Sequence, residues 1–248
     1  MARRIYPRDV PEAEGTVSAP DLTLMKEDAP PREPTGRAVF NGRRDSGRSG
    51  EAWRRMPPAL PPWYRVDQQT QRWWAAGVCE ARVDDWRRLL RPAAGRQAEP
   101  RAIIIDGRTL PSSPERGARA GDDGHKQRPG SQGHRGVARL GRRLTRLVTP
   151  ANQPERAQGE ARAEAVQAST DDAVEGALVD EGDPGAQAPP DAAHHGLRLA
   201  VVKRPDAISG FVLLPRRWLV ERSLGWMARF RRRARHFERL ADTLVGWP

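Results

Sequence analysis

A run of three isoleucines that ends on an acidic residue sets the strongest limit on how this chain folds. Ile103–Ile105 hold three of the five isoleucines in the sequence, and Asp106 follows them directly. β-branched side chains favour strands, and a short apolar run of this length is typical of a buried strand. The segment 174-VEGALVD-180 repeats the pattern, because it is also an apolar stretch that ends on an aspartate. The sequence therefore predicts two buried strands, each with a carboxylate at its end.

The order of the elements after residue 100 indicates an α/β fold. Strands are expected at 102–106, 134–140, 143–149, 174–180 and 197–203, a polar loop at 111–133, a helix at 154–168, and a long helix that starts past Pro215 and runs to Leu244. A weaker helix at 186–195 is interrupted by two prolines. Strands and helices in this order predict a mixed sheet flanked by helices, in a domain that spans residues 100–248.

The first 95 residues are expected to form a small helical domain, partly irregular over residues 1–50. The stretch 41-NGRRDSGRSG-50 is interpreted as a solvated loop because it is rich in glycine and charge. A helix is predicted over 64–77, where Gly77 ends it. A second helix follows, because four residues recur at helical spacing: Cys79, Val83, Trp86 and Leu90.

This helix–glycine–helix unit has a basic second helix and resembles a helix-turn-helix, in which Arg82 and Arg87 would contact DNA. A helical hairpin that packs on itself is an equally good interpretation. The net charge of +11 and the pI of about 11.1 favour a polyanionic partner such as nucleic acid. The alternative is a basic protein whose many arginines reflect codon usage.

Other features of the composition narrow the class of protein. A single cysteine, Cys79, excludes an intramolecular disulfide and a cysteine-rich zinc site. No apolar run approaches the roughly 20 residues of a membrane span, and we see no secretory signal. Leu, Ile, Val and Phe make up about 17% of the residues, so a chain without a stable fold is an open alternative. The eight tryptophans argue against it.

Three acidic residues could form one metal site. Functional groups in α/β sheets gather beyond the carboxyl ends of strands, where Asp106 and Asp180 stand. On neighbouring parallel strands their carboxylates would repel, and a divalent cation would relieve that repulsion; ligands that are all oxygens favour Mg²⁺ or Mn²⁺. Glu221, near the start of the last helix, is the third candidate. Each acid could instead be a turn residue or a surface partner of an arginine.

The C-terminal segment carries the most specific signature in the sequence. Residues 202–240, VKRPDAISGFVLLPRRWLVERSLGWMARFRRRARHFERL, resemble almost throughout the C-terminal signature of bacterial insertion-sequence DDE transposases with an RNase H-like catalytic domain. Further similarity to that family lies at 102-AIIIDGRT-109, 117-GARAGDDGHK-126, 130-GSQGH-134, 148-VTPANQPERAQ-158 and 179-VDEGDPG-185, and in the leading domain at 1-MARRIYP-7, 57-PPALPPW-63 and 68-QQTQRWWAAGV-78.

This resemblance implies a function and a set of site residues. Asp106, Asp180 and Glu221 would be the catalytic triad and would hold Mg²⁺ or Mn²⁺. The arginines near Glu221 and on the basic face of the last helix would bind DNA phosphates: Arg217, Arg222, Arg229 and Arg232. The implied chemistry is cleavage at insertion-sequence ends, followed by attack of the resulting 3′-hydroxyl on target DNA. The resemblance also implies that the protein acts as a homodimer on DNA. It would be located in the bacterial cytoplasm, at the nucleoid, and would have no membrane partner.

Several positions depart from the family pattern. Asp122 stands where the family has a tyrosine, and Asp183 and Pro184 stand where it has an aromatic and a small residue. The last helix stops short at Gly246-Trp247-Pro248, which predicts a C-terminally truncated catalytic domain. The alternative function is therefore a degenerate copy, a catalytically inactive and partly disordered DNA-binding remnant of such a transposase.

Overall fold

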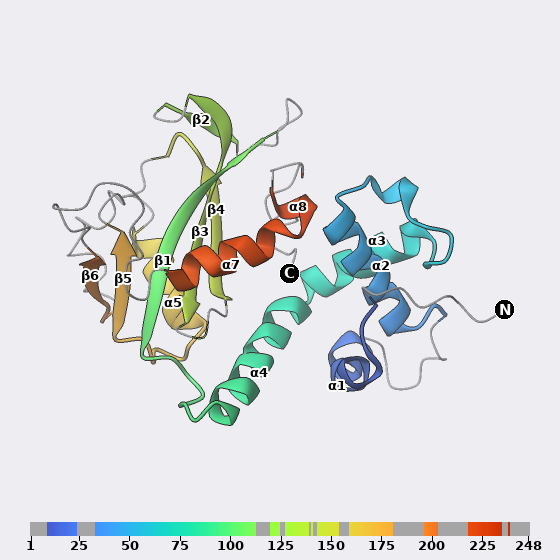
Figure 1. Cartoon of the computed structure of the whole chain (residues 1–248), viewed down its shortest axis with the longest axis horizontal. Coiled ribbons are helices and arrows are strands. Elements are labelled where there is room, and N and C mark those ends of the chain that lie inside the picture. Colours follow the sequence, from blue (N-terminus) through green and yellow to red (C-terminus); the bar gives the residue numbers. More distant parts are fainter. Residues whose placement is uncertain are drawn as a thin grey trace. The chain divides into compact units, whose positions relative to one another are not determined.

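The computed structural model describes residues 9–23, 33–112, 120–124, 127–138, 140, 143–153, 159–180, 196–202, 218–234 and 238 (Figure 1). The chain divides into two compact units. The helical unit comprises residues 1–82, 229–234 and 246–248, and the sheet unit comprises residues 83–228 and 235–245. This division falls inside helix α4 (Val78–Ala93). The domain boundary expected between residues 95 and 100 stays a prediction.

Within the described residues, the sheet unit is built on a six-stranded mixed sheet. Its strands are β1 (Ala102–Pro111), β2 (Gly121–Asp123), β3 (Arg128–Ala138), β4 (Arg143–Pro150), β5 (Gly176–Asp180) and β6 (Arg198–Val202). The strand order is β2-β3-β1-β5-β6, and β4 also pairs with β3. Strand β3 runs antiparallel to β1, β2 and β4, whereas β5 runs parallel to both β1 and β6. The isoleucine strand β1 is thus central.

The isoleucine run explains why helices cover both faces of this sheet. Side chains alternate between the two faces of a strand. The first and third isoleucines lie in a buried cluster with side chains of α5 (Gly159–Ala168). The second, Ile104, lies in another cluster with Leu219 of α7 (Trp218–Ala228). Figure 1 shows α5 and α7 on opposite sides of the sheet, so the run is buried from both.

The helical unit has its own hydrophobic core. It contains α1 (Glu12–Thr23), α2 (Gly36–Ser49), the 3₁₀ turn η1 (Trp53–Arg55), α3 (Trp63–Ala75), the first part of α4, and α8 (Arg231–Ala234). Its buried core residues are Val10, Leu22, Val39, Phe40, Val66 and Trp73. Gly77 separates α3 from α4 with a positive φ of 65°, which glycine adopts without strain. The predicted helix–glycine–helix unit is therefore confirmed.

The solvated loop expected at 41–50 is wrong, because α2 continues to Ser49. Thr35 caps the helix by accepting a hydrogen bond from the Ala38 amide at 3.3 Å. A Cβ on Gly42 would come within 2.9 Å of the Val66 side chain, so this glycine allows close packing of α2 on α3. The glycines and charges of this stretch serve contacts between helices, and not a loop in solvent.

Two further expectations were wrong. The polar stretch 111–133 contains β2 and the first part of β3, because backbone pairing with β1 orders it even without apolar side chains. A Cβ on Gly130 would lie 2.4 Å from the carbonyl oxygen of Leu110, so glycine is required at this pairing. The single long C-terminal helix is interrupted, since α7 ends at Ala228 and the short α8 begins at Arg231.

The expected fold class is confirmed: a mixed α/β sheet flanked by helices, consistent with the RNase H-like arrangement, together with a helical N-terminal region. The strands predicted around 143–149, 174–180 and 197–203 are present with shifts of one or two residues at their ends. The strand expected at 102–106 is longer than predicted, because β1 stays paired with β3 up to Pro111, so Asp106 lies within β1 and not at its end. The helix expected at 186–195 lies outside the described residues. Among the described helices, none is both long and apolar enough to span a membrane.

Candidate active site

The parallel pairing of β1 with β5 fixes the level of Asp106 relative to Asp180. The last paired position is Ile104 with Leu178, and every β5 residue in this ladder is numbered 74 higher than its β1 partner. Asp106 and Asp180 each follow this last pair by two residues. The register therefore brings the two predicted aspartates to one level on adjacent strands, at the carboxyl end of β5.

A basic residue lies on the other side of Asp106. Strand β3 pairs antiparallel with β1, and Arg135 is directly opposite Asp106. Directly opposite residues share a face of the sheet. Arg135 is buried, and Asp106 is half-buried. Arg135 was not among the predicted site residues, and only the strand register identifies it, because 29 positions separate it from Asp106.

Glu221 lies in the first turn of α7, the helix that packs on the face of the sheet where Ile104 lies. Leu219 and Ser223 of α7 are buried, whereas Glu221 is exposed. Two residues along a helix correspond to a rotation of about 200°. The Glu221 side chain is therefore on the side of α7 that faces away from the Leu219 contact with Ile104.

The three acids stay a predicted metal site. Within the part of the chain that the structure describes, no three His, Cys, Asp or Glu side chains gather closely enough to hold a metal ion. The side chain of Asp180 is outside that part, so this absence does not extend to the complete triad. The backbone register of the two strands is the geometric observation that bears on the site.

Arg222, next to Glu221, is stacked between two tryptophans of the same helix. Its guanidinium carbon lies 4.5 Å from the ring centroid of Trp218 and 4.7 Å from that of Trp226. One guanidinium nitrogen donates a hydrogen bond to the carbonyl oxygen of Leu140 at 3.2 Å. The i, i+4, i+8 spacing of these residues can be read from the sequence, but the tryptophans were not among the predicted site residues.

The other arginines predicted to bind DNA differ widely in exposure. Arg229 is exposed, whereas Arg217 lies outside the described residues. Arg232 donates a hydrogen bond to the Ser46 hydroxyl at 2.7 Å and stacks on Trp53 at 4.8 Å, within the helical unit. Arg82 contacts Ser18, Asp21 and the ring of Phe40, and burial lowers the pKa of its guanidinium. The last two arginines therefore also stabilise the helical unit.

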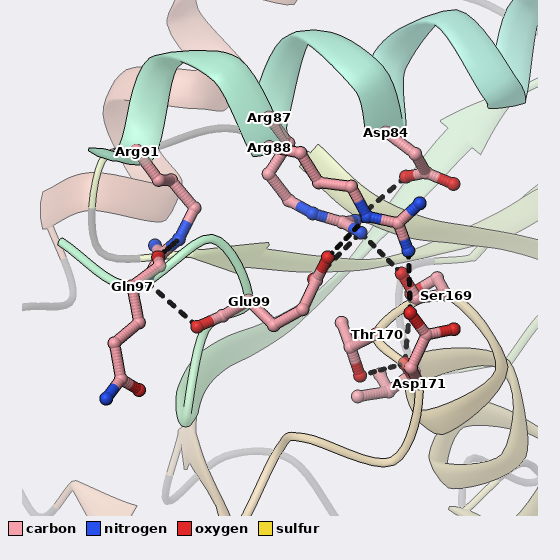
Figure 2. A network of polar contacts seen from close by, with 10 residues as sticks. Asp84, Arg87, Arg88, Arg91, Gln97, Glu99, Ser169, Thr170 and Asp171 are labelled. Carbon is pink, nitrogen blue, oxygen red and sulfur yellow. Dashed lines mark hydrogen bonds and ion pairs between the residues drawn. The ribbon is translucent and has the colours of Figure 1, made fainter. Parts of the chain in front are cut away.

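Arg87 belongs to a buried network and not to a free basic surface (Figure 2). Its side chain is fully buried and lies 2.8 Å from Asp84 and 2.9 Å from Glu99. It also donates a hydrogen bond to the carbonyl oxygen of Ser169 at 2.6 Å. This arginine joins the second part of α4 to the segment that enters β1 and to the end of α5.

Two neighbouring arginines of α4 complete the network in Figure 2. Arg88 contacts Glu99 and Asp171, each at 2.7 Å, and its hydrogen bond to Glu99 raises the pKa of the guanidinium. Arg91 donates to the carbonyl oxygens of Gln97 and Glu99 at 2.8 and 3.3 Å, while burial lowers its pKa. Sequence reasoning missed the network because its members come from three separate segments.

The comparisons with known proteins give one finding. A family model described as "Transposase DDE domain" matches residues 97–247, which is more than half of the chain. No curated protein and no solved structure matches the chain.

Proposed function

The chain belongs to the family of transposase DDE domains, and on this premise we propose that it cuts and joins DNA strands at the ends of an insertion sequence. The observation that carries the proposal is the shared level of Asp106 and Asp180 on neighbouring parallel strands. Catalytic groups of α/β sheets gather at this end of the strands. The family supports a polynucleotidyl-transferase type of enzyme, and the specific chemistry is the proposed part.

The two aspartates fit a divalent cation. Strand alternation predicts that residues two apart share a face, which gives Asp106 the face of Ile104 and predicts for Asp180 the face of Leu178. Ile104 and Leu178 belong to one cluster, so this is the face covered by α7. The donors are carboxylate oxygens, which suit Mg²⁺ or Mn²⁺. When bound, such an ion supplies Lewis-acid stabilisation of charge on a phosphoryl oxygen.

Each further residue has a role in the proposal. Glu221 completes the triad from α7, where its side chain is exposed. Arg135 offsets part of the negative charge at Asp106 while no cation is bound.

The proposed partners are the terminal inverted repeats and a target duplex, bound by a homodimer in the bacterial cytoplasm. Arg229 is exposed, as a phosphate contact requires. Arg217, Arg222 and Arg232 remain in the proposal, as does Arg82. Arg87 is excluded from it, because its guanidinium is buried between Asp84 and Glu99. The net charge of +11 supports salt-dependent binding to duplex DNA.

A second candidate is the DNA-binding remnant without catalysis. The observation in its favour is the exposed side chain of Glu221 on the far side of α7 from the contact with Ile104. Such a remnant binds duplex DNA in a salt-sensitive way that Asp180→Asn and Glu221→Gln leave unchanged.

A cleavage assay decides between the two candidates. The full chain is incubated with Mg²⁺ and a duplex that carries the repeats flanking its coding sequence. The proposal expects nicks at the repeat ends that disappear in Asp106→Asn. Glu175→Gln is the matched control, because Glu175 is an exposed acid at the opposite end of β5. If the wild type and Asp106→Asn bind the duplex equally well and neither nicks it, the chain is a DNA-binding remnant without catalysis.

A further inference from the structure

A row of three stacked side chains on α7 forms a second candidate binding surface, which we call the Trp–Arg–Trp face. It consists of Trp218, Arg222 and Trp226. We propose that this face binds unpaired nucleotides of a DNA strand, with bases stacked on the indole rings and a phosphate beside the guanidinium. The proposal rests on the proposed function and specifies the form of DNA that the enzyme holds near Glu221.

The geometry of the helix places the three groups in one row. Residues at i, i+4 and i+8 follow one another along a single side of a helix, at a rise of about 6 Å per step. The rings remain accessible, since Trp218 is 39% exposed and Trp226 is 48% exposed. Exposed aromatic side chains that lie next to one another can mark a binding surface. Here the packing of α7 on the sheet uses Leu219 and Leu224 instead.

The positive charge of Arg222 at the centre of the row favours an anionic ligand. The contacts of Arg222 in the described part of the chain are the two rings and the Leu140 carbonyl oxygen. Its Nε has no hydrogen-bond partner there, although it is buried from solvent. No carboxylate among the described residues forms an ion pair with it. The guanidinium is thus held in place with its Nε shielded from solvent, and its charge and donor geometry suit a phosphate oxygen.

Aromatic rings together with an arginine match a single strand better than a duplex. In a duplex the bases already stack on one another, whereas an unpaired base offers a free π-face to an indole ring. Surfaces of this composition bind single strands with little sequence preference. A hydrophobic protein partner would use the rings but would leave the Arg222 charge unpaired at a cost. The observations therefore favour an unpaired DNA strand as the occupant.

Binding measurements on the full chain in EDTA test the proposal, because strand binding needs no cation. Three labelled probes are compared by fluorescence anisotropy: single-stranded oligothymidine, an abasic strand of the same length, and a duplex of the same length. Wild type is expected to bind oligothymidine more tightly than the abasic strand. Trp218→Ala and Trp226→Ala should each weaken oligothymidine binding about tenfold and leave abasic binding unchanged.

Conservative variants separate stacking from folding. Trp218→Phe and Trp226→Phe keep a π-face and are expected to retain most of the preference for oligothymidine. Val201→Ala, an exposed apolar position on β6, is the control for surface changes in the same unit. If Ala variants fail to fold, the Phe variants and the wild-type comparison of the two strands still decide.

Two results would overturn the proposal. One is equal wild-type affinity for oligothymidine and the abasic strand. The other is an Ala variant that binds oligothymidine as tightly as the wild type, even if the substitution changes the oligomeric state of the chain. Neither result depends on cleavage. The chain could nick DNA even if the Trp–Arg–Trp face does not bind a single strand, and it could bind a single strand even if it does not nick DNA.

Discussion

Asp106 on β1 and Asp180 on β5 stand two residues beyond the same backbone pair, Ile104 with Leu178, on neighbouring parallel strands. This relationship is set by the hydrogen-bond register and does not depend on side-chain conformation. On its other side Asp106 is opposite the buried Arg135. Asp106 thus lies between the strand that carries Asp180 and the strand that carries Arg135. In this arrangement a bound metal ion and the Arg135 guanidinium would compete for the Asp106 carboxylate.

This competition leads to the first prediction. Arg135→Gln removes a positive charge beside the proposed cation site and should tighten Mn²⁺ binding about tenfold. Isothermal titration of the full chain with Mn²⁺ measures the effect, with a thermal melt to confirm that the variant folds. Arg198→Gln is the matched control, because Arg198 is an exposed arginine at the start of β6. Equal affinities of wild type and Arg135→Gln would show that Arg135 does not act on the site.

The second prediction concerns the buried charge network around Arg87. Arg87→Met keeps much of the side-chain volume but removes the buried cation that contacts Asp84, Glu99 and the Ser169 carbonyl oxygen, and leaves Glu99 only the half-exposed Arg88. It should therefore lower the free energy of unfolding by about 3 kcal/mol. Arg101→Met is the control, since its ion pair with Glu175 is exposed and is worth about 0–1 kcal/mol. Urea denaturation followed by circular dichroism compares the two. Losses of equal size would contradict the structural role of Arg87.

The third prediction uses two glycines with opposite surroundings. Gly130→Ala places a Cβ 2.4 Å from the Leu110 carbonyl oxygen, so β1 and β3 must separate at this point. We expect a loss of about 1–3 kcal/mol in the free energy of unfolding. A Cβ on Gly225 of α7 would meet no described atom within 4 Å, so Gly225→Ala should stabilise the helix by up to ~1 kcal/mol. Melting temperatures should shift in opposite directions; a shift of both in one direction would be inconsistent with the described packing.

The fourth prediction concerns the C-terminal segment that packs in the helical unit. Arg232 bonds to Ser46 and stacks on Trp53, and a Cβ on Gly50 would lie 2.8 Å from the Arg231 side chain. Arg232→Ala should therefore speed amide exchange in α2 about fivefold, which corresponds to about 1 kcal/mol. Hydrogen–deuterium exchange of peptides from α2 measures this. Exposed Arg229→Ala is the control, and unchanged exchange in Arg232→Ala would refute the contact.

The sequence predicted the parts of this fold that depend on local pattern. The isoleucine run predicted β1, and Gly77 predicted the break between α3 and α4, because both signals lie within a few residues. The stretch 41–50 was misassigned because its glycines and charges pack against elements distant in the sequence, such as α3 and α8, which no local pattern reveals.

The candidate site was predictable to a similar extent. Asp106 and Asp180 were identified because each follows an apolar run, and the parallel register agrees with a shared location. Arg135 and the partners of Arg87 could not be found in this way, since their positions follow from strand pairing and from contacts between distant segments. The roles of all three acids stay predictions until a cation is measured.

Binding of Mn²⁺ measured by electron paramagnetic resonance tests the central claim most directly, because free and bound Mn²⁺ give different signal intensities. The account predicts that the full chain binds Mn²⁺, that Asp106→Asn and Asp180→Asn each abolish this binding, and that Glu175→Gln at the far end of β5 retains it. Binding that survives in both aspartate variants, or no binding by the wild-type chain, would contradict a cation site shared by Asp106 of β1 and Asp180 of β5.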